Sequence, residues 1–173
     1  KYKTVSNWRI EEGEWKKGHK RKAYRQWRER KAHCGEMLQI DGSHHDWFEG
    51  RGTACVLMGY IDDATGRAYC RFYEYEGTIP AMDSFKRYIK KNGIPVSAYM
   101  DKHTTYKSPV KQTPEEEIEG IEPLSEFGRA LKELGVNIIH ANSPQAKGRI
   151  ERLFKTLQDR LVKEMRLRGI STI

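Results

Sequence analysis

Three strand-like segments follow one another before the first helical pattern begins, and this order restricts the possible folds more than any other feature. The segments cover residues 36–41, 53–62 and 67–76, and they are rich in apolar, aromatic and β-branched side chains. The last two are joined by Asp63-Ala64-Thr65-Gly66, a sequence typical of a tight turn. Strands joined by short turns pair in antiparallel fashion, so we expect an antiparallel meander of three strands.

Helical and strand-like segments then alternate toward the end of the chain. A helix is expected from Thr78, as its capping residue, to Asn92-Gly93. The later segments are a strand ending at Asp101, a helix at 123–134, a strand at 136–140 and a helix at 146–168. Such alternation places parallel strands side by side with helices over the sheet. We therefore predict an α/β fold whose mixed five-stranded sheet has three antiparallel strands, then two parallel ones, with helices on both faces.

Two segments stand apart from this predicted core of residues 35–173. Residues 1–34 are expected to form a basic helical arm or linker, and residues 107–122 an exposed acidic insertion. In the arm Arg21, Arg25 and Arg28 recur at helical spacing among Trp and Tyr side chains. Arginine interleaved with aromatic residues favours contact with nucleic acid. Alternatively, the arm's tryptophans dock it on the core or on a second subunit.

The charge distribution also favours a polyanionic partner. Lys and Arg outnumber Asp and Glu by 12 to 4 in residues 1–35 and by 8 to 3 in residues 147–173, whereas acids lead by 17 to 12 in residues 36–146. Basic flanks around an acidic centre suit a polyanion that must approach carboxylates through bridging cations. The plainer alternative is that the basic segments are solvated helix faces.

The sequence also bears on the compartment. No apolar stretch approaches the roughly 18 residues that a membrane-spanning helix needs, so no membrane partner is expected. The three cysteines, Cys34, Cys55 and Cys70, form no C-x-x-C pair, which favours reduced thiols and a cytoplasmic location.

Three acidic residues carry the expected chemistry. Asp41 and Asp101 each end an apolar strand-like run, and Glu151 lies just inside the last helix. Carboxyl ends of strands meet at one edge of a sheet, where the mutual repulsion of these acids calls for a cation. Carboxylate oxygens without a matching cysteine or histidine set indicate Mg²⁺ or Mn²⁺. This is the chemistry of phosphodiester cleavage and transfer.

The pieces around these acids resemble the catalytic core of the retroviral-integrase superfamily, in its bacterial insertion-sequence transposase branch. They are Leu38-Gln39-Ile40-Asp41-Gly42-Ser43, Ile61-Asp62-Asp63-Ala64-Thr65, and the stretch from Ser143-Pro144-Gln145 to Glu151. The resemblance runs from about Gly35 to Arg168 and implies a ribonuclease H-like fold. One departure is the spacing of 49 residues between Asp101 and Glu151, which is longer than in many relatives and which the insertion explains.

The resemblance carries the metal-binding role of the family's acids to Asp41, Asp101 and Glu151, with two Mg²⁺ or Mn²⁺ ions bridged by Asp41. It also implies DNA contacts by Lys155 and Gln158, four and seven residues after the glutamate; the alternative is that both are merely solvated. Further DNA contacts are expected from Lys147 and Arg149 before the glutamate. Lys102 and His103 follow Asp101 and are expected to contact phosphate or orient the leaving oxygen.

The implied activity is cleavage at the 3′ end of a mobile element and transfer of that end into target DNA, by a DDE-type polynucleotidyl transferase. The implied partners are double-stranded DNA and further copies of the chain, at least a dimer, in association with a bacterial nucleoid. Further domains are expected on both sides of residues 1–173. Two other functions stay open: a ribonuclease H-like structure-specific nuclease, and an inactive DNA-binding or assembly module.

Overall fold

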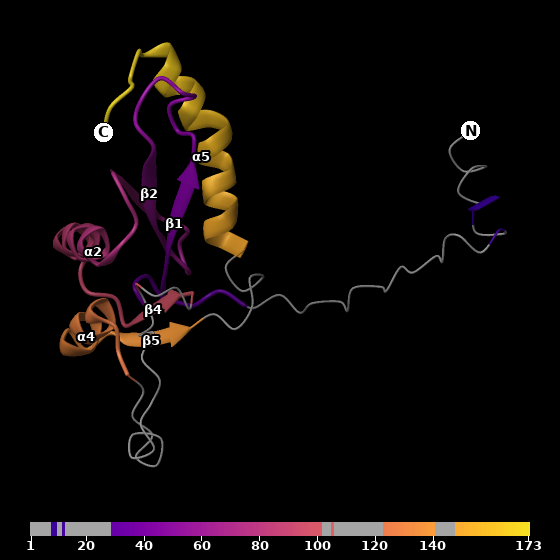
Figure 1. Cartoon of the computed structure of the whole chain (residues 1–173). Helices are drawn as coiled ribbons and strands as arrows, with labels where there is room; N and C mark the ends of the chain where they lie inside the picture. The colour runs from indigo at the N-terminus through magenta and orange to yellow at the C-terminus, as the bar shows by residue number, and fades with distance from the viewer. Residues whose placement is uncertain (1–7, 10–11, 13–28, 102–104, 106–122, 141–147) are drawn as a thin grey trace.

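The structure, a computed structural model, describes residues 8–9, 12, 29–101, 105, 123–140 and 148–173. It consists of one five-stranded sheet covered by helices on both faces (Figure 1). The elements in chain order are β1 (Leu38–His45), β2 (Cys55–Asp62), β3 (Ala68–Tyr73), α2 (Thr78–Asn92), β4 (Ser97–Met100), α4 (Glu126–Glu133), β5 (Asn137–His140) and α5 (Gly148–Leu167). The basic arm's Arg21, Arg25 and Arg28 and the insertion at 107–122 lie outside the described residues.

The strands lie in the order β3-β2-β1-β4-β5. The pairs β1–β2 and β2–β3 are antiparallel, whereas β1–β4 and β4–β5 are parallel. The meander followed by two parallel strands is thus confirmed. Each parallel connection needs a crossover, and the chain provides one through α2 between β3 and β4 and another through α4 between β4 and β5.

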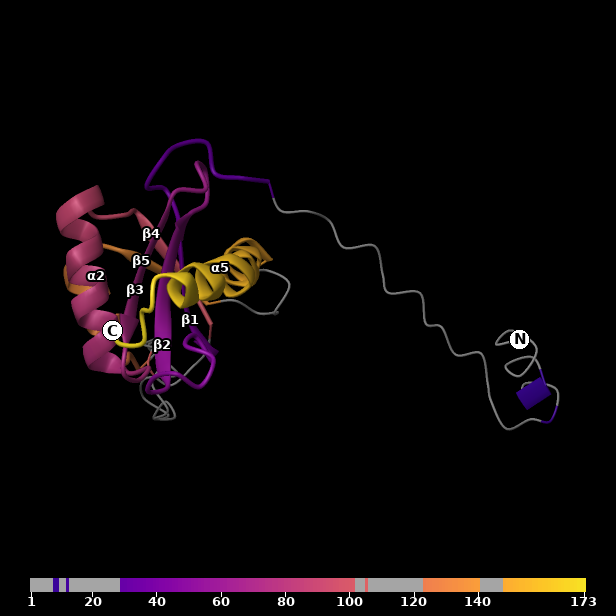
Figure 2. The same cartoon turned by 90° about the horizontal axis from the view of Figure 1, so that it is seen from above.

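The two faces of the sheet bury separate apolar clusters. On one face Val56, Met58 and Tyr60 of β2 pack with side chains of α2 and α4. The intervening Leu57 and Ile61 point to the other face, where they meet Ile150 of α5 among others. Figure 2 shows α2 and α5 on opposite sides of the sheet. Both faces of β2 are therefore covered, and all eight of its residues are buried.

Two local expectations were wrong. We expected the first strand to stop at Asp41, but β1 continues to His45 because the antiparallel ladder with β2 runs unbroken from Leu38 to His45. Thr78 was expected to cap the helix, but Gly77 holds the cap position and no side chain caps this end.

Within the described residues, no helix has the length and apolar character needed to cross a membrane.

Candidate active site

The register of the central strands bears on two of the three acids. β1 and β4 pair in parallel at Leu38–Ala98 and Gln39–Tyr99. Continued by two positions, this offset of 60 residues puts Asp101, the first residue after β4, level with Asp41 in β1. Neighbouring strands lie about 4.8 Å apart, so we expect the two residues to lie near one another. Both residues are half-buried, and Asp41 Oδ1 accepts a hydrogen bond from the Gly42 amide at 3.1 Å.

The close approach of α5 to the sheet identifies the face on which Asp41 lies. In the β1–β2 ladder Asp41 pairs with Gly59, and directly paired residues direct their side chains to the same face. A Cβ atom at Gly59 would lie 2.6 Å from two ring carbons of Phe154 in α5. The missing side chain therefore allows the helix to lie directly on the strand pair at Asp41.

The contacts along α5 set the height of Glu151. Two residues before it, Arg149 reaches Asp63 at the end of β2. Three residues after it, Phe154 covers Gly59. Because a helix rises about 1.5 Å per residue, Glu151 lies at a level between these two contacts. Its position along the helix thus matches the part of β1 that ends at Asp41, and its side chain is exposed.

The structure does not gather all three acids into a ligand set. Among residues 29–101, 123–140 and the other described positions, no group of three His, Cys, Asp or Glu side chains is placed to hold a metal ion. Their assignment as ligands of two metal ions therefore stays a prediction. The donor chemistry of the three residues suits a hard divalent cation, because all three are carboxylates, two of them half-buried and one exposed.

The predicted DNA contacts on α5 differ in their surroundings. Lys155 is exposed. Gln158 is half-buried and donates a hydrogen bond from Nε2 to Ser43 Oγ at 3.1 Å. Arg149 turns inward and pairs with the buried Asp63, so it has a partner inside the protein. These three contacts with DNA remain predictions.

The other predicted DNA contacts, Lys102, His103 and Lys147, lie outside the described residues, as do the arginines of the arm.

Sequence reasoning assigned no site role to two further carboxylates, one near Asp41 and one at the turn end of β2. Glu76 lies over Gly42, because a Cβ atom added at Gly42 would be 2.7 Å from Cδ of Glu76. Glu76 Oε2 also forms a hydrogen bond with His44 Nε2 at 2.7 Å. Asp63, interpreted only as a turn residue, is fully buried. The one available signal was Gly42 directly after Asp41, since a glycine in a strand often marks a close neighbour.

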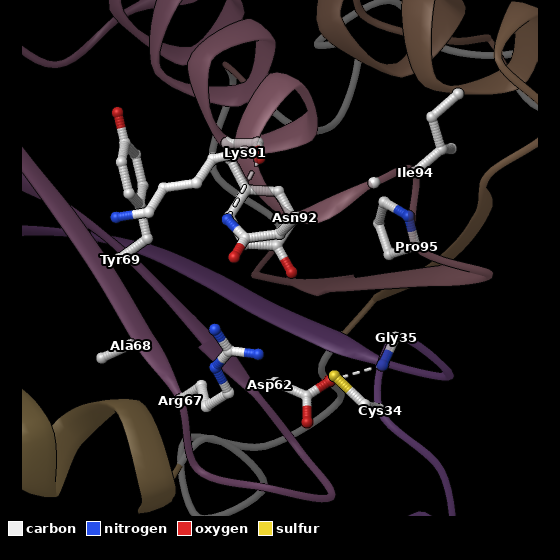
Figure 3. Close-up of a pocket in the computed structure, with 12 residues that line it drawn as sticks. Cys34, Gly35, Asp62, Arg67, Ala68, Tyr69, Lys91, Asn92, Ile94 and Pro95 are labelled. Atoms are coloured by element: carbon white, nitrogen blue, oxygen red, sulfur yellow. Dashed lines mark hydrogen bonds between the residues drawn. The ribbon is translucent and has the colours of Figure 1, made fainter.

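A cavity of about 310 Å³ lies at the other end of the strands (Figure 3). Its lining includes Cys34, Arg67 and Lys91, and none of the three candidate ligands. Asp62 contributes to the wall and accepts the Gly35 amide at 2.7 Å. Burial raises the pKa of Asp62, but hydrogen bonds from Thr65 and Gly35 outweigh it, and the pKa falls below its ordinary value. This carboxylate is thus fully engaged in structure.

Two known transposases are similar in sequence to this chain. No protein-family model matches the sequence. A putative transposase, y4bF, of Sinorhizobium fredii is 43% identical over 168 residues, which is 96% of this chain and 36% of that protein. The transposase for insertion sequence IS1202 of Streptococcus pneumoniae is 33% identical over 84% of this chain and 30% of its own length. The sequence of the chain is thus similar to parts of two transposases, one of them from an insertion sequence. It spans about a third of the length of these two relatives.

Solved structures place the chain in a known fold. A simian T-cell lymphotropic virus intasome, in complex with a PP2A regulatory subunit, matches with a TM-score of 0.63 and 18% identity, over 84% of this chain and 46% of that chain. The HTLV-2 integrase catalytic core domain in complex with magnesium matches with a TM-score of 0.54 and 15% identity, over 76% and 73%. The chain therefore has the ribonuclease H-like fold of retroviral integrase cores.

Proposed function

We propose that this chain is the catalytic core of a DDE-type transposase that cleaves the 3′ ends of its element and joins them to target DNA. The observation that carries the proposal is the parallel pairing of β1 with β4, which favours a position of Asp101 level with Asp41, together with the contact of the Glu151 helix with Gly59 opposite Asp41. Identity of 43% with a putative transposase supports the choice of reaction. The integrase-like fold alone would not, because one fold hosts many activities.

Asp41, Asp101 and Glu151 are the residues that would hold divalent metal. Two Mg²⁺ or Mn²⁺ ions bound there would act as Lewis acids that stabilise charge on the attacking and leaving oxygens of an in-line displacement. Magnesium is present in the HTLV-2 integrase core that shares this fold. The protein's own contribution is rigidity: the β1–β2 ladder and the Phe154–Gly59 contact fix the strand and the helix on which these acids stand.

The proposed substrate is double-stranded DNA, held by at least two copies of the chain. Lys155 is exposed one helical turn after Glu151, where it can reach a phosphate near the acids. Structures with this fold include dimeric and trimeric integrase cores and an intasome. A cytoplasmic, nucleoid-associated location follows from a DNA substrate.

A strand-transfer assay tests the proposal. The protein, with Mn²⁺, is given a duplex that carries the element's end sequence with a free 3′-OH, together with a target plasmid. A transposase joins the 3′-OH to the target, which is visible as labelled product of increased length. Cleavage of an RNA–DNA hybrid without joining would instead assign a ribonuclease H-like nuclease. DNA binding with neither reaction, at any Mn²⁺ concentration, would leave only an assembly role.

A further inference from the structure

A buried carboxylate outside the three candidate ligands links the parts of the molecule that carry them. Asp63 is fully buried directly after β2. Burying a charge is costly unless hydrogen-bond donors and an opposite charge compensate for it. The donors that compensate Asp63 come from distant segments of the chain, and each segment leads to a part of the candidate site.

Among the described residues, three donors to this carboxylate stand out. The Lys31 amide donates to Oδ2 at 2.9 Å, and Gln39 Nε2 donates to Oδ1 at 3.0 Å. The guanidinium of Arg149 also forms an ion pair with Oδ1. The Arg149 side chain is only 14% exposed. The connection into the core, strand β1 and the start of α5 therefore meet at a single side chain.

These donors stand very close to the candidate ligands along the chain. Gln39 lies two residues before Asp41 on the same face of β1, because side chains alternate along a strand. Arg149 lies two residues before Glu151 in the first turn of α5. Asp41 and Glu151 are thus carried by two elements, β1 and α5, that both donate to the buried carboxylate of Asp63.

The neighbouring aspartate shows that the turn itself does not require Asp63. Asp62 Oδ1 accepts the amide and the hydroxyl of Thr65, three residues later, as a turn-forming aspartate does. The side-chain donors to Asp63 lie 24 and 86 residues away in sequence. Its role is therefore long-range, and the turn has its own acceptor.

We propose that Asp63, through its ion pair with Arg149, is a positioning residue that sets Glu151 at the correct height beside Asp41 for divalent-metal binding. The inference rests on the proposed function, because it takes Asp41 and Glu151 as ligands. Outer residues that orient metal ligands typically change metal affinity by about 10- to 100-fold when they are lost. The same range is expected here.

The test measures Mn²⁺ binding to the DNA-free protein by electron paramagnetic resonance, beside the thermal unfolding midpoint. The double variant Asp63→Asn with Arg149→Met removes both charges, so no buried charge is left without a partner and the net charge is unchanged. We expect it to fold and to bind Mn²⁺ at least about tenfold more weakly than the unsubstituted chain.

The matched control is Asp159→Asn with Lys163→Met, which removes an exposed ion pair at 2.6 Å on the same helix with the same net charge change. It should leave Mn²⁺ affinity unchanged. If the double variant does not fold, Arg149→Lys takes its place. It keeps the charge but shortens the reach, and it should show the same weakening to a smaller degree.

The outcomes separate the two proposals. A folded double variant, or Arg149→Lys, that binds Mn²⁺ as tightly as the unsubstituted chain overturns the positioning role alone. Equal weakening in the Asp159–Lys163 control also overturns it, because the effect would then not depend on Asp63. Failure of the unsubstituted chain to bind Mn²⁺ would overturn the metal site itself, and with it the proposed function.

Discussion

Two groups of carboxylates have different surroundings in the fold. At the turn end of the β1–β2 pair, Asp62 and Asp63 are only 3% and 0% exposed, and each accepts several hydrogen bonds from the protein. In the second group, Asp41 in the middle of β1 and Asp101 after β4 are half-buried, and Glu151 of α5 is exposed. The first pair is held within the protein, whereas the second group can be reached from solvent.

The difference separates acids that hold the fold together from acids that are available for chemistry. A buried carboxylate needs fixed donors, and those donors make it a permanent part of the structure. A carboxylate that solvent can reach can exchange water for a cation or a substrate atom. Substitution should therefore lower stability at Asp62 and Asp63, and lower activity in the group of Asp41, Asp101 and Glu151.

The largest expected effect is loss of activity from the solvent-reachable group. Asp41→Asn, Asp101→Asn and Glu151→Gln should each reduce strand cleavage by at least about a hundredfold, because metal ions supply several kcal/mol to such reactions. DNA binding and the unfolding midpoint should change little. Mn²⁺-dependent nicking of a labelled duplex measures strand cleavage, and a gel-shift titration measures DNA binding. Near-normal nicking by any one variant would remove that residue from the ligand set.

The next effect is at the contact that joins the two elements. Gly59→Ala places a Cβ atom against the Phe154 ring, and overpacking of this kind costs about 1–3 kcal/mol. We expect a lower unfolding midpoint in calorimetry together with slower nicking, since the helix that carries Glu151 must shift. Gly148→Ala is the control, because its Cβ would meet its nearest neighbour at an ordinary 3.7 Å. Unchanged stability in Gly59→Ala would mean that the helix does not lie where the structure places it.

At the turn end, Asp62→Asn should cost about 1 kcal/mol of unfolding free energy, because hydrogen bonds to a charged acceptor are replaced by bonds to a neutral one. The pKa of Asp62 is lowered in the folded protein, so its stabilisation is present above the unfolded pKa and is lost as the pH falls through the folded value. Urea unfolding of both proteins should give a constant difference above about pH 5 that shrinks below about pH 4. A difference independent of pH would contradict the proposed role of the charge.

The smallest expected effect concerns DNA contact beside the acids. Lys155→Ala should weaken DNA binding to a similar degree for all sequences and lower the slope of log affinity against log salt concentration by about one. Lys163→Ala, on the same helix but bonded to Asp159, is the control. Equal slopes for Lys155→Ala and the unsubstituted chain would show that this lysine does not touch phosphate.

Most of the fold could be predicted because its signals are local. The strand and helix segments were located to within a few residues, and the helix after Gly77 ends at Asn92 where Gly93 follows. Alternation of apolar residues and punctuation by Gly and Pro act over a few positions, so a single sequence contains them. The end of β1 was misplaced because the ladder with β2, and not the apolar pattern, carries the strand on to His45.

The sequence by itself determined the order of the elements and their division between two faces of a mixed sheet. Only the tertiary structure decided that Arg149 turns inward to Asp63 and that Phe154 lies on Gly59. These contacts join residues 86 and 95 positions apart in the chain. No local pattern encodes such a pairing, because the burial that makes it necessary exists only after the sheet and its last helix have come together.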